Sequence, residues 1–224
     1  MQKRIKLCDR TLPNYTFAEE LTNTLTHAVG CLGGMAALVL CVVKAALNYG
    51  ATEVVAAAIY GVCLIALYSV SSIYHAWRPG TTKKVLQVLD HCAIYFLIAG
   101  SYTIISLGAI RRADPTLGWG IFITEWVLCA VATTLTAIDL HKYQVFSMIC
   151  YIGMGWAVLP FMGILWQILS PTGFYLLLAG GIAYTIGAVL YGIGAKVRWM
   201  HSVFHVFVVI GSVLHFLTFY FFNM

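Results

Sequence analysis

Residues 54–76 read VVAAAIYGVCLIALYSVSSIYHA, a run that contains no acidic or basic residue before its penultimate histidine, His75. About 20 consecutive apolar residues are enough for one helix to cross the hydrocarbon core of a bilayer. The run is continuously apolar and does not alternate with polar residues, which excludes a transmembrane β-barrel strand. This stretch therefore predicts a membrane-spanning α-helix, and it sets the pattern to look for in the rest of the chain.

The same pattern recurs throughout the sequence. Hydrophobic residues make up 61% of the 224 positions and charged residues only 9%, whereas a soluble domain carries roughly 25% charged residues. Seven stretches are long and apolar enough to span: residues 25–47, 54–76, 85–108, 117–137, 143–165, 172–194 and 200–222. The connections are short, so we expect a polar tail, residues 1–20, followed by one all-α domain, residues 21–224, embedded in a lipid bilayer.

The basic residues favour one orientation of this domain. Cationic loops remain on the cytoplasmic side, and an inside amino terminus puts ten basic residues inside: Lys3, Arg4, Lys6, Arg10, Arg78, Lys83, Lys84, Lys142, Lys196 and Arg198. Only Arg111 and Arg112 then fall in outer segments, while Lys44 is expected to extend to the outer headgroups. Seven spans place Met224 outside. The net charge of +5 forms no basic face, which argues against a nucleic-acid partner.

Polar side chains inside spans are costly and therefore indicate function. In this topology His75 ends the second span, Asp90 opens the third, and His201 and His205 open the seventh, so all four lie in the inner leaflet. A spacing of four residues puts His201 and His205 on one helix face, about 6 Å apart in height. Ser71 precedes His75 by the same spacing.

Three imidazoles with a fourth position open to water are typical of a catalytic zinc site. Zinc lowers the pKa of bound water to about 7, and Asp90 is placed to accept its proton while Ser71 holds the water. We therefore predict zinc bound by His75, His201 and His205. The alternative is that each histidine is a lone hydrogen bonder between helices.

The remaining polar residues have weaker patterns. A polar stripe at the start of the first span consists of Glu20, Asn23 and His27. Three uses are open for it: orienting a metal ligand, capping the helix or contacting lipid headgroups. His91 points about 100° away from Asp90, and His215 lies about 15 Å above His205, so both are expected to form interhelical bonds. Glu125 is expected to be protonated and hydrogen-bonded.

The ordered set Ser71-x-x-x-His75, Asp90 and His201-x-x-x-His205 resembles the haemolysin III and progestin/adipoQ receptor family, which includes the adiponectin receptors. Glu20-x-x-Asn23-x-x-Thr26-His27 is similar to the family's entry to its first helix, and the short tail and loops resemble the bacterial branch. The resemblance extends from about Glu19 onward. It implies a seven-helix bacterial plasma-membrane protein with an intracellular amino terminus and one zinc bound by the three histidines, with Ser71 and Asp90 contacting its water.

The resemblance also suggests activities. The animal receptors are associated with ceramidase activity, and the bacterial branch with haemolysis and membrane lipid homeostasis. Our first hypothesis is a zinc-dependent hydrolase of a lipid amide or ester, and the second is a zinc-containing receptor or lipid sensor without turnover. A pore-forming cytolysin is the third, and it is disfavoured because the fifth and sixth spans carry no charged or histidine side chain.

Overall fold

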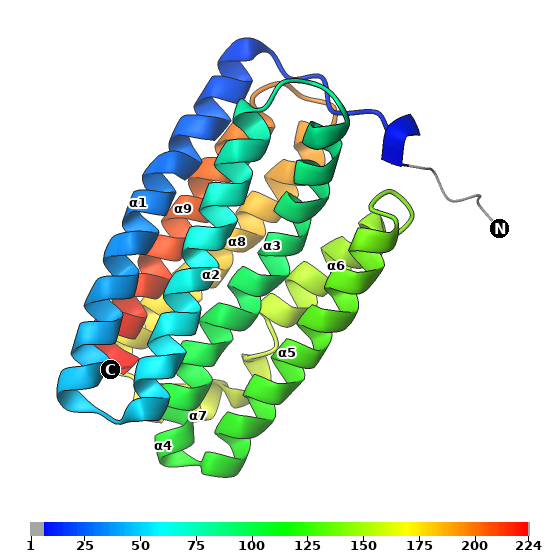
Figure 1. The fold of residues 1–224 in the computed structure, drawn as a ribbon. Coiled ribbons are helices and arrows are strands. Elements are labelled where there is room, and N and C mark those ends of the chain that lie inside the picture. Colours follow the sequence, from blue (N-terminus) through cyan, green and yellow to red (C-terminus); the bar gives the residue numbers. More distant parts are fainter. Residues whose placement is uncertain (1–6, 224) are drawn as a thin grey trace.

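The computed structural model describes residues 7–223, and within them seven helices are long and apolar enough to cross a membrane (Figure 1). This confirms the predicted all-α, seven-span architecture. The first four spans are α1 (Phe17–Asn48), α2 (Ala51–Ala76), α3 (Thr81–Ile105) and α5 (Pro115–Ile138). The last three are α6 (Gln144–Gly155) continued by α7 (Met162–Ile168), then α8 (Pro171–Gly194) and α9 (Met200–Thr218). Residues 1–6 of the expected tail and Met224 lie outside the described residues.

The third span is the centre of the bundle. Its most apolar window is 83% buried inside the protein, whereas the corresponding windows of the other six spans are 11–50% buried. Helices α2 and α5 pack on α3, while α1 and α9 lie side by side on the far side of α2 (Figure 1). The outer helices expose apolar side chains such as Val29, Leu47 and Val145. Lipid is the solvent that accepts such a surface.

The first helix begins eight residues before its predicted start at residue 25. Thr16 is its N-cap: the Thr16 hydroxyl accepts the Glu19 N–H at 3.3 Å, and the Glu19 carboxylate accepts the Thr16 N–H at 2.8 Å. This reciprocal pair satisfies two otherwise unpaired backbone donors. Residues 17–20, which the sequence analysis placed in the polar tail, are therefore helical.

The fifth span is confirmed, since the stretch Gln144–Ile168 is long and apolar enough to cross a membrane, but its helix is interrupted. Helix α6 ends at Gly155 and α7 starts at Met162, with a 3-10 turn, η3 (Leu159–Phe161), between them. Pro160 lies in this turn, and a proline ring both removes a backbone donor and clashes with the preceding helical turn. The Tyr102 hydroxyl accepts the Val158 N–H at 2.9 Å and donates to the Gly155 carbonyl at 3.1 Å.

The third span also ends irregularly. A wide turn, η2 (Ser106–Ile110), contains Gly108 with non-helical backbone angles, and the short α4 (Arg111–Ala113) follows it. The buried Asn223 amide accepts the Ala109 N–H at 3.0 Å and donates to the Ile104 carbonyl at 2.9 Å. Asn223 belongs to η4 (Phe219–Asn223), a wide turn at the end of α9. Its side chain therefore satisfies one backbone group before the irregular turn in the third span and one within it.

Candidate metal centre

Three histidines from two distant parts of the sequence meet inside the bundle. His75 lies in the last turn of α2, and His201 and His205 lie one turn apart at the start of α9. The Nε2 atoms of His75 and His201 are 3.4 Å apart, and those of His201 and His205 are 3.1 Å apart. The three side chains are buried, with 1–7% of each residue exposed.

This spacing fits a metal ion. Metal–nitrogen bonds of about 2.0–2.1 Å in tetrahedral geometry require nitrogen atoms about 3.3 Å apart. Two of the three separations, 3.4 Å for His75–His201 and 3.1 Å for His201–His205, are close to this value, and all three donor atoms lie within 4.8 Å of one another. The cluster of His75, His201 and His205 can therefore hold a metal ion.

His75 is oriented by the start of α1. Its Nδ1 atom lies 2.6 Å from Glu20 Oε2 and 3.4 Å from Asn23 Nδ2. The second Glu20 oxygen accepts a hydrogen bond from Lys83 at 2.7 Å, and Lys83 is itself buried. A carboxylate on one ring nitrogen fixes the histidine tautomer and directs the other nitrogen at the metal. Of the three uses that the sequence left open for the Glu20 and Asn23 stripe, the geometry favours orienting a ligand.

Two aromatic rings cover the histidines of α9. The His27 ring, from the same stripe, stacks on His205 with centroids 3.8 Å apart. Tyr15 stacks on His201 at 4.9 Å with an interplanar angle of 23°. Burial raises the pKa of the Tyr15 phenol, so it remains neutral at physiological pH. The sequence analysis missed Tyr15, because a tyrosine in a polar tail carries no signal that it folds back over the site.

The position of His201 depends on the turn before α9. Trp199 precedes this helix in a left-handed conformation, φ 67°, and its N–H donates to Glu19 Oε1 at 2.8 Å. At the end of α8, a Cβ added to Gly194 would lie only 2.9 Å from the backbone nitrogen of His201. Glu19 of the α1 capping box and Gly194 of α8 thus allow α9 to start close to both helices.

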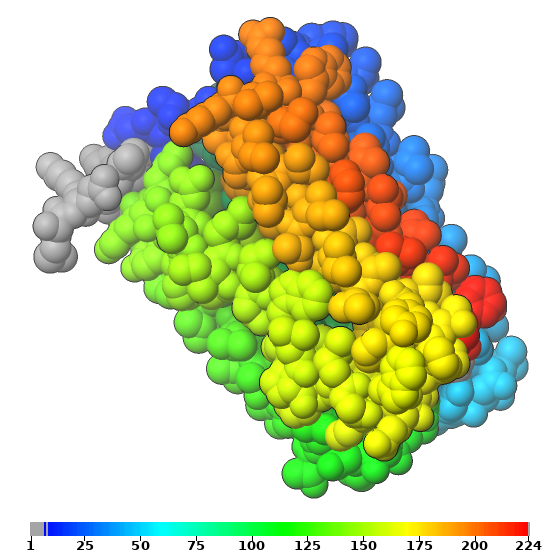
Figure 2. All heavy atoms as spheres, turned by 180° about the vertical axis from the view of Figure 1, so that it is seen from behind, coloured from blue at the N-terminus to red at the C-terminus, as the bar shows by residue number. Residues whose placement is uncertain are grey.

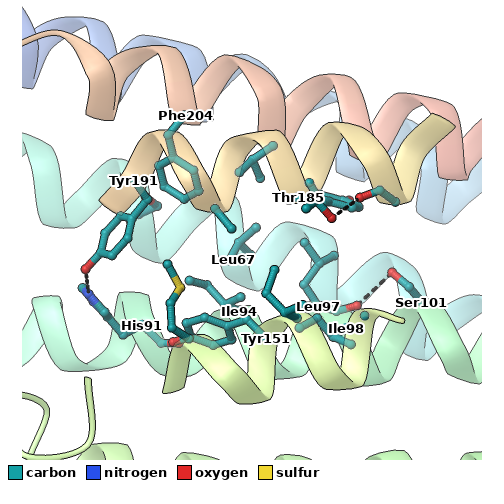
Figure 3. A pocket seen from close by; sticks show the side chains of 18 of the residues that line it. Leu67, His91, Ile94, Leu97, Ile98, Ser101, Tyr151, Thr185, Tyr191 and Phe204 are labelled. Atoms are coloured by element: carbon teal, nitrogen blue, oxygen red, sulfur yellow. Dashed lines mark hydrogen bonds between the residues drawn. The ribbon is translucent and has the colours of Figure 1, made fainter. Parts of the chain in front are cut away.

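Ser71 and Asp90 lie on the wall of a cavity of about 140 Å³ that His27 and His201 also line. Ser71 is buried, one turn before His75 on α2, and Asp90 is half-buried on α3. The rest of the wall is mostly aliphatic and aromatic, as the close view of its lining residues in Figure 3 shows. The structure therefore brings both predicted water-contacting residues to the same cavity as one of the three clustered histidines.

The remaining polar residues of the spans lie apart from the three histidines. His91 bonds the Tyr191 hydroxyl of α8 at 2.9 Å (Figure 3), and His215 bonds the Leu177 carbonyl at 3.2 Å, so both form the expected interhelical bonds. Glu125 is buried, but its Oε2 atom has no hydrogen-bond partner among the described residues, so the expected hydrogen bonding fails at that atom. The Lys44 amine donates to the Tyr220 carbonyl and lies 4.6 Å from the centre of that ring, while its contact with headgroups stays a prediction.

Comparison with known proteins gives one consistent family. A family model described as "Haemolysin-III related" matches residues 15–216. "Hemolysin-3" of Bacillus cereus is 35% identical, with 88% of this chain and 89% of the relative covered, and "Hemolysin-3 homolog" of Bacillus subtilis (strain 168) is 36% identical, with 88% and 91% covered. The human "Monocyte to macrophage differentiation factor" is 26% identical, with 85% and 81% covered.

No solved structure gives a significant match. The family match begins at Tyr15 and contains all three clustered histidines, and it confirms the resemblance that the ordered motifs suggested. Seven apolar helices together with these relatives fit a multi-pass protein of the bacterial cell membrane. The chain belongs to the haemolysin III-related family of membrane proteins.

Proposed function

We propose that this protein is a zinc-dependent membrane hydrolase that cleaves an amide or ester bond of a lipid. The observation that carries the proposal is the three-nitrogen cluster of His75, His201 and His205, together with Ser71 and Asp90 on the cavity next to it. Among the described residues the group of potential ligands contains these three members only. Structural zinc sites close all four positions with protein ligands, whereas catalytic sites leave one open.

The chemistry of the donors favours zinc over other ions. Imidazole nitrogens suit zinc, while calcium and magnesium prefer oxygen ligands. The three histidine side chains are buried, and their group of potential ligands among the described residues contains no cysteine. Zinc at such a site acts as a Lewis acid and generates a nucleophile from water near neutral pH.

The chain supplies two further groups for hydrolysis. Asp90 accepts the proton that the attacking water releases, and then delivers it to the leaving amine or alkoxide. Ser71 accepts or donates one hydrogen bond that orients this water. Glu20 orients the His75 ring through its contact with His75 Nδ1, and it does not need to touch the substrate. Both Ser71 and Asp90 line a shared cavity, which supports a role for them beside an entering substrate carbonyl.

The cavity favours a lipid substrate. Leu67, Ile94, Leu97 and Ile98 line it (Figure 3), and Ser71 and Asp90 are among its polar lining residues. A largely apolar cavity with some polar groups selects a ligand with an acyl chain and a polar linkage. The surrounding helices lie in a bilayer, so such a molecule reaches the site from lipid.

The experiment is release of free fatty acid from a panel of amide and ester lipids by purified, zinc-loaded protein. The wild type should release fatty acid, and His75→Ala protein, which cannot retain the metal, should not. Asp90→Asn protein is the second control, because its metal site is intact. Zinc-loaded wild type that releases no more fatty acid than metal-free His75→Ala protein would overturn the hydrolase and favour a receptor or lipid sensor.

A further inference from the structure

A second, larger and more polar cleft opens at the end of the bundle where α1 and α9 begin. Its volume is about 780 Å³, and it lies between residues 11–15, the turn around Leu140–Gln144, and the α8–α9 turn, residues 195–199. Figure 2 shows this face, where α6 (yellow-green) and α8 (yellow-orange) flank a furrow below the α8–α9 turn. Nothing in the proposed hydrolysis uses this cleft so far.

The cleft adjoins the apolar cavity. Five residues line both spaces: His91, Met148, Tyr151, Tyr191 and His201. Of these, His201 also belongs to the three-histidine cluster. A molecule that extends from the cleft into the cavity therefore passes a metal-ligating histidine at the junction. The bond nearest the metal is then the one that joins the polar part of that molecule to its apolar part.

The net charge of the cleft wall is positive. Lys196 and Arg198 are exposed on the α8–α9 turn and line the cleft. Against them stands Glu19, the one carboxylate among the described residues of the wall, which is only 3% exposed and accepts hydrogen bonds from Trp199 and Thr16. His141 adds an imidazole to the same wall. Lysine and arginine bind phosphate oxygens through charge-assisted hydrogen bonds.

We propose that the cleft binds the phosphate-bearing headgroup of an acidic phospholipid while one acyl chain fills the cavity. This inference rests on the proposed function and narrows its substrate class to anionic glycerolipids. Hydrolysis adds water across the ester bond: the acyl carbon gains the hydroxyl, the alcohol oxygen gains a proton, and a fatty acid and a lysophospholipid leave. No other reactant is needed.

Binding is tested without turnover. Purified protein in neutral detergent is titrated with dioleoyl phosphatidylglycerol and with dioleoyl phosphatidylcholine, and bound lipid is counted by native mass spectrometry. We expect the anionic lipid to bind at least tenfold more tightly. Lys196→Gln and Arg198→Gln should each weaken its binding by roughly fivefold. Arg78→Gln is the matched control, because it removes one positive charge at the same end of the bundle outside the cleft, and binding should not change.

Four outcomes decide the inference. Equal affinity for the two lipids, or no effect of Lys196→Gln and Arg198→Gln, would overturn it. Displacement of phosphatidylglycerol by inorganic phosphate at equal concentration would also overturn it, because the acyl chain would then contribute nothing. Failure of that displacement, together with the charge dependence, supports it.

The two proposals fail in different ways. Selective binding of phosphatidylglycerol without fatty acid release would leave the headgroup site standing and remove the hydrolase. Equal release of fatty acid from phosphatidylcholine and phosphatidylglycerol would leave the hydrolase standing and remove the headgroup preference.

Discussion

Glu20 Oε2 lies 2.6 Å from His75 Nδ1, which joins the start of α1 to the end of α2. The same carboxylate accepts a hydrogen bond from Lys83 of α3 at 2.7 Å, so three helices meet at one side chain. With Nδ1 donating to Glu20, the lone pair of His75 lies on Nε2, which faces His201 Nε2 at 3.4 Å. Glu20, at the start of α1, thus fixes the tautomer of His75 on α2.

Our first prediction follows from this contact. Glu20→Gln should weaken zinc retention by about 10- to 100-fold, the usual effect of losing the partner of a metal-bound histidine. Zinc remaining after dialysis against a graded series of chelator concentrations measures it. Glu53→Gln is the matched control, because Glu53 is also buried and ion-paired, to Arg111 at 2.7 Å, in a different part of the bundle. Equal zinc loss in both variants would show that Glu20 acts only through general stability.

The second prediction tests the ligands. His75→Ala, His201→Ala and His205→Ala should each abolish tight binding of one zinc per chain, because each removes one of three metal bonds. His91→Ala and His215→Ala should retain zinc, since their rings bond Tyr191 and Leu177 instead. Elemental analysis of the purified variants measures this. A metal-free His215→Ala protein beside a zinc-loaded His75→Ala protein would show that the ligands are misassigned.

The sequence predicted the seven helices and the meeting of His75 with His201 and His205 because both follow from short-range regularities. Span length is a count of apolar residues, and the common depth of the histidines follows from where each lies in its own helix. Glu20, Asn23 and His27 could be placed on one helix face, but their uses stayed open. Which face of α1 meets α2 and α9 is decided by packing.

The features that the sequence did not predict depend on distant partners. Pro160 marks a place where a helix can break, but the break is stabilised by Tyr102, more than fifty residues earlier. Trp199 gives no hint of a left-handed conformation, which its hydrogen bond to Glu19 maintains across the bundle. Tyr15 lies in a polar segment and reaches His201 only because α1 begins early.

The third prediction concerns that break. Tyr102→Phe should destabilise the protein by about 1–3 kcal/mol, because the Val158 N–H and the Gly155 carbonyl both lose a hydrogen-bond partner within a membrane span, where no water replaces it. Thermal unfolding in detergent measures the change. Tyr175→Phe, at an exposed tyrosine of α8, is the control and should have little effect. Equal stability of the two variants would mean that the interruption does not depend on the Tyr102 hydroxyl.

The fourth prediction is the orientation in the membrane, which the distribution of basic residues favours. Single cysteines placed in the Arg78–Lys84 loop should be shielded from an impermeant thiol reagent in intact cells, and cysteines at 111–114 should be labelled. A cysteine-free background is the starting point, since the sequence contains seven cysteines. Labelling of the Arg78–Lys84 loop from outside would invert the topology and put the histidine cluster in the outer leaflet.

The last prediction separates chemistry from binding. Asp90→Asn should keep zinc and fold but lose turnover by on the order of 10² to 10⁴, the usual contribution of general acid or base catalysis. Ser71→Ala should lose less, because a neutral hydrogen bond contributes only about 0.5–1.5 kcal/mol net. Both residues line the cavity without belonging to the three-histidine group, so zinc content should match the wild type in both variants.

Steady-state release of fatty acid, measured on the same samples as zinc content, decides between the roles of these two residues. A residue that acts mainly in the transition state lowers kcat and kcat/KM together and leaves substrate binding almost unchanged. A zinc-free Asp90→Asn protein would instead make Asp90 a ligand. Fully active, zinc-loaded Asp90→Asn protein would remove the proposed base, and proton transfer would then need another group on the cavity wall, of which His27, stacked on His205, is the nearest to a ligand.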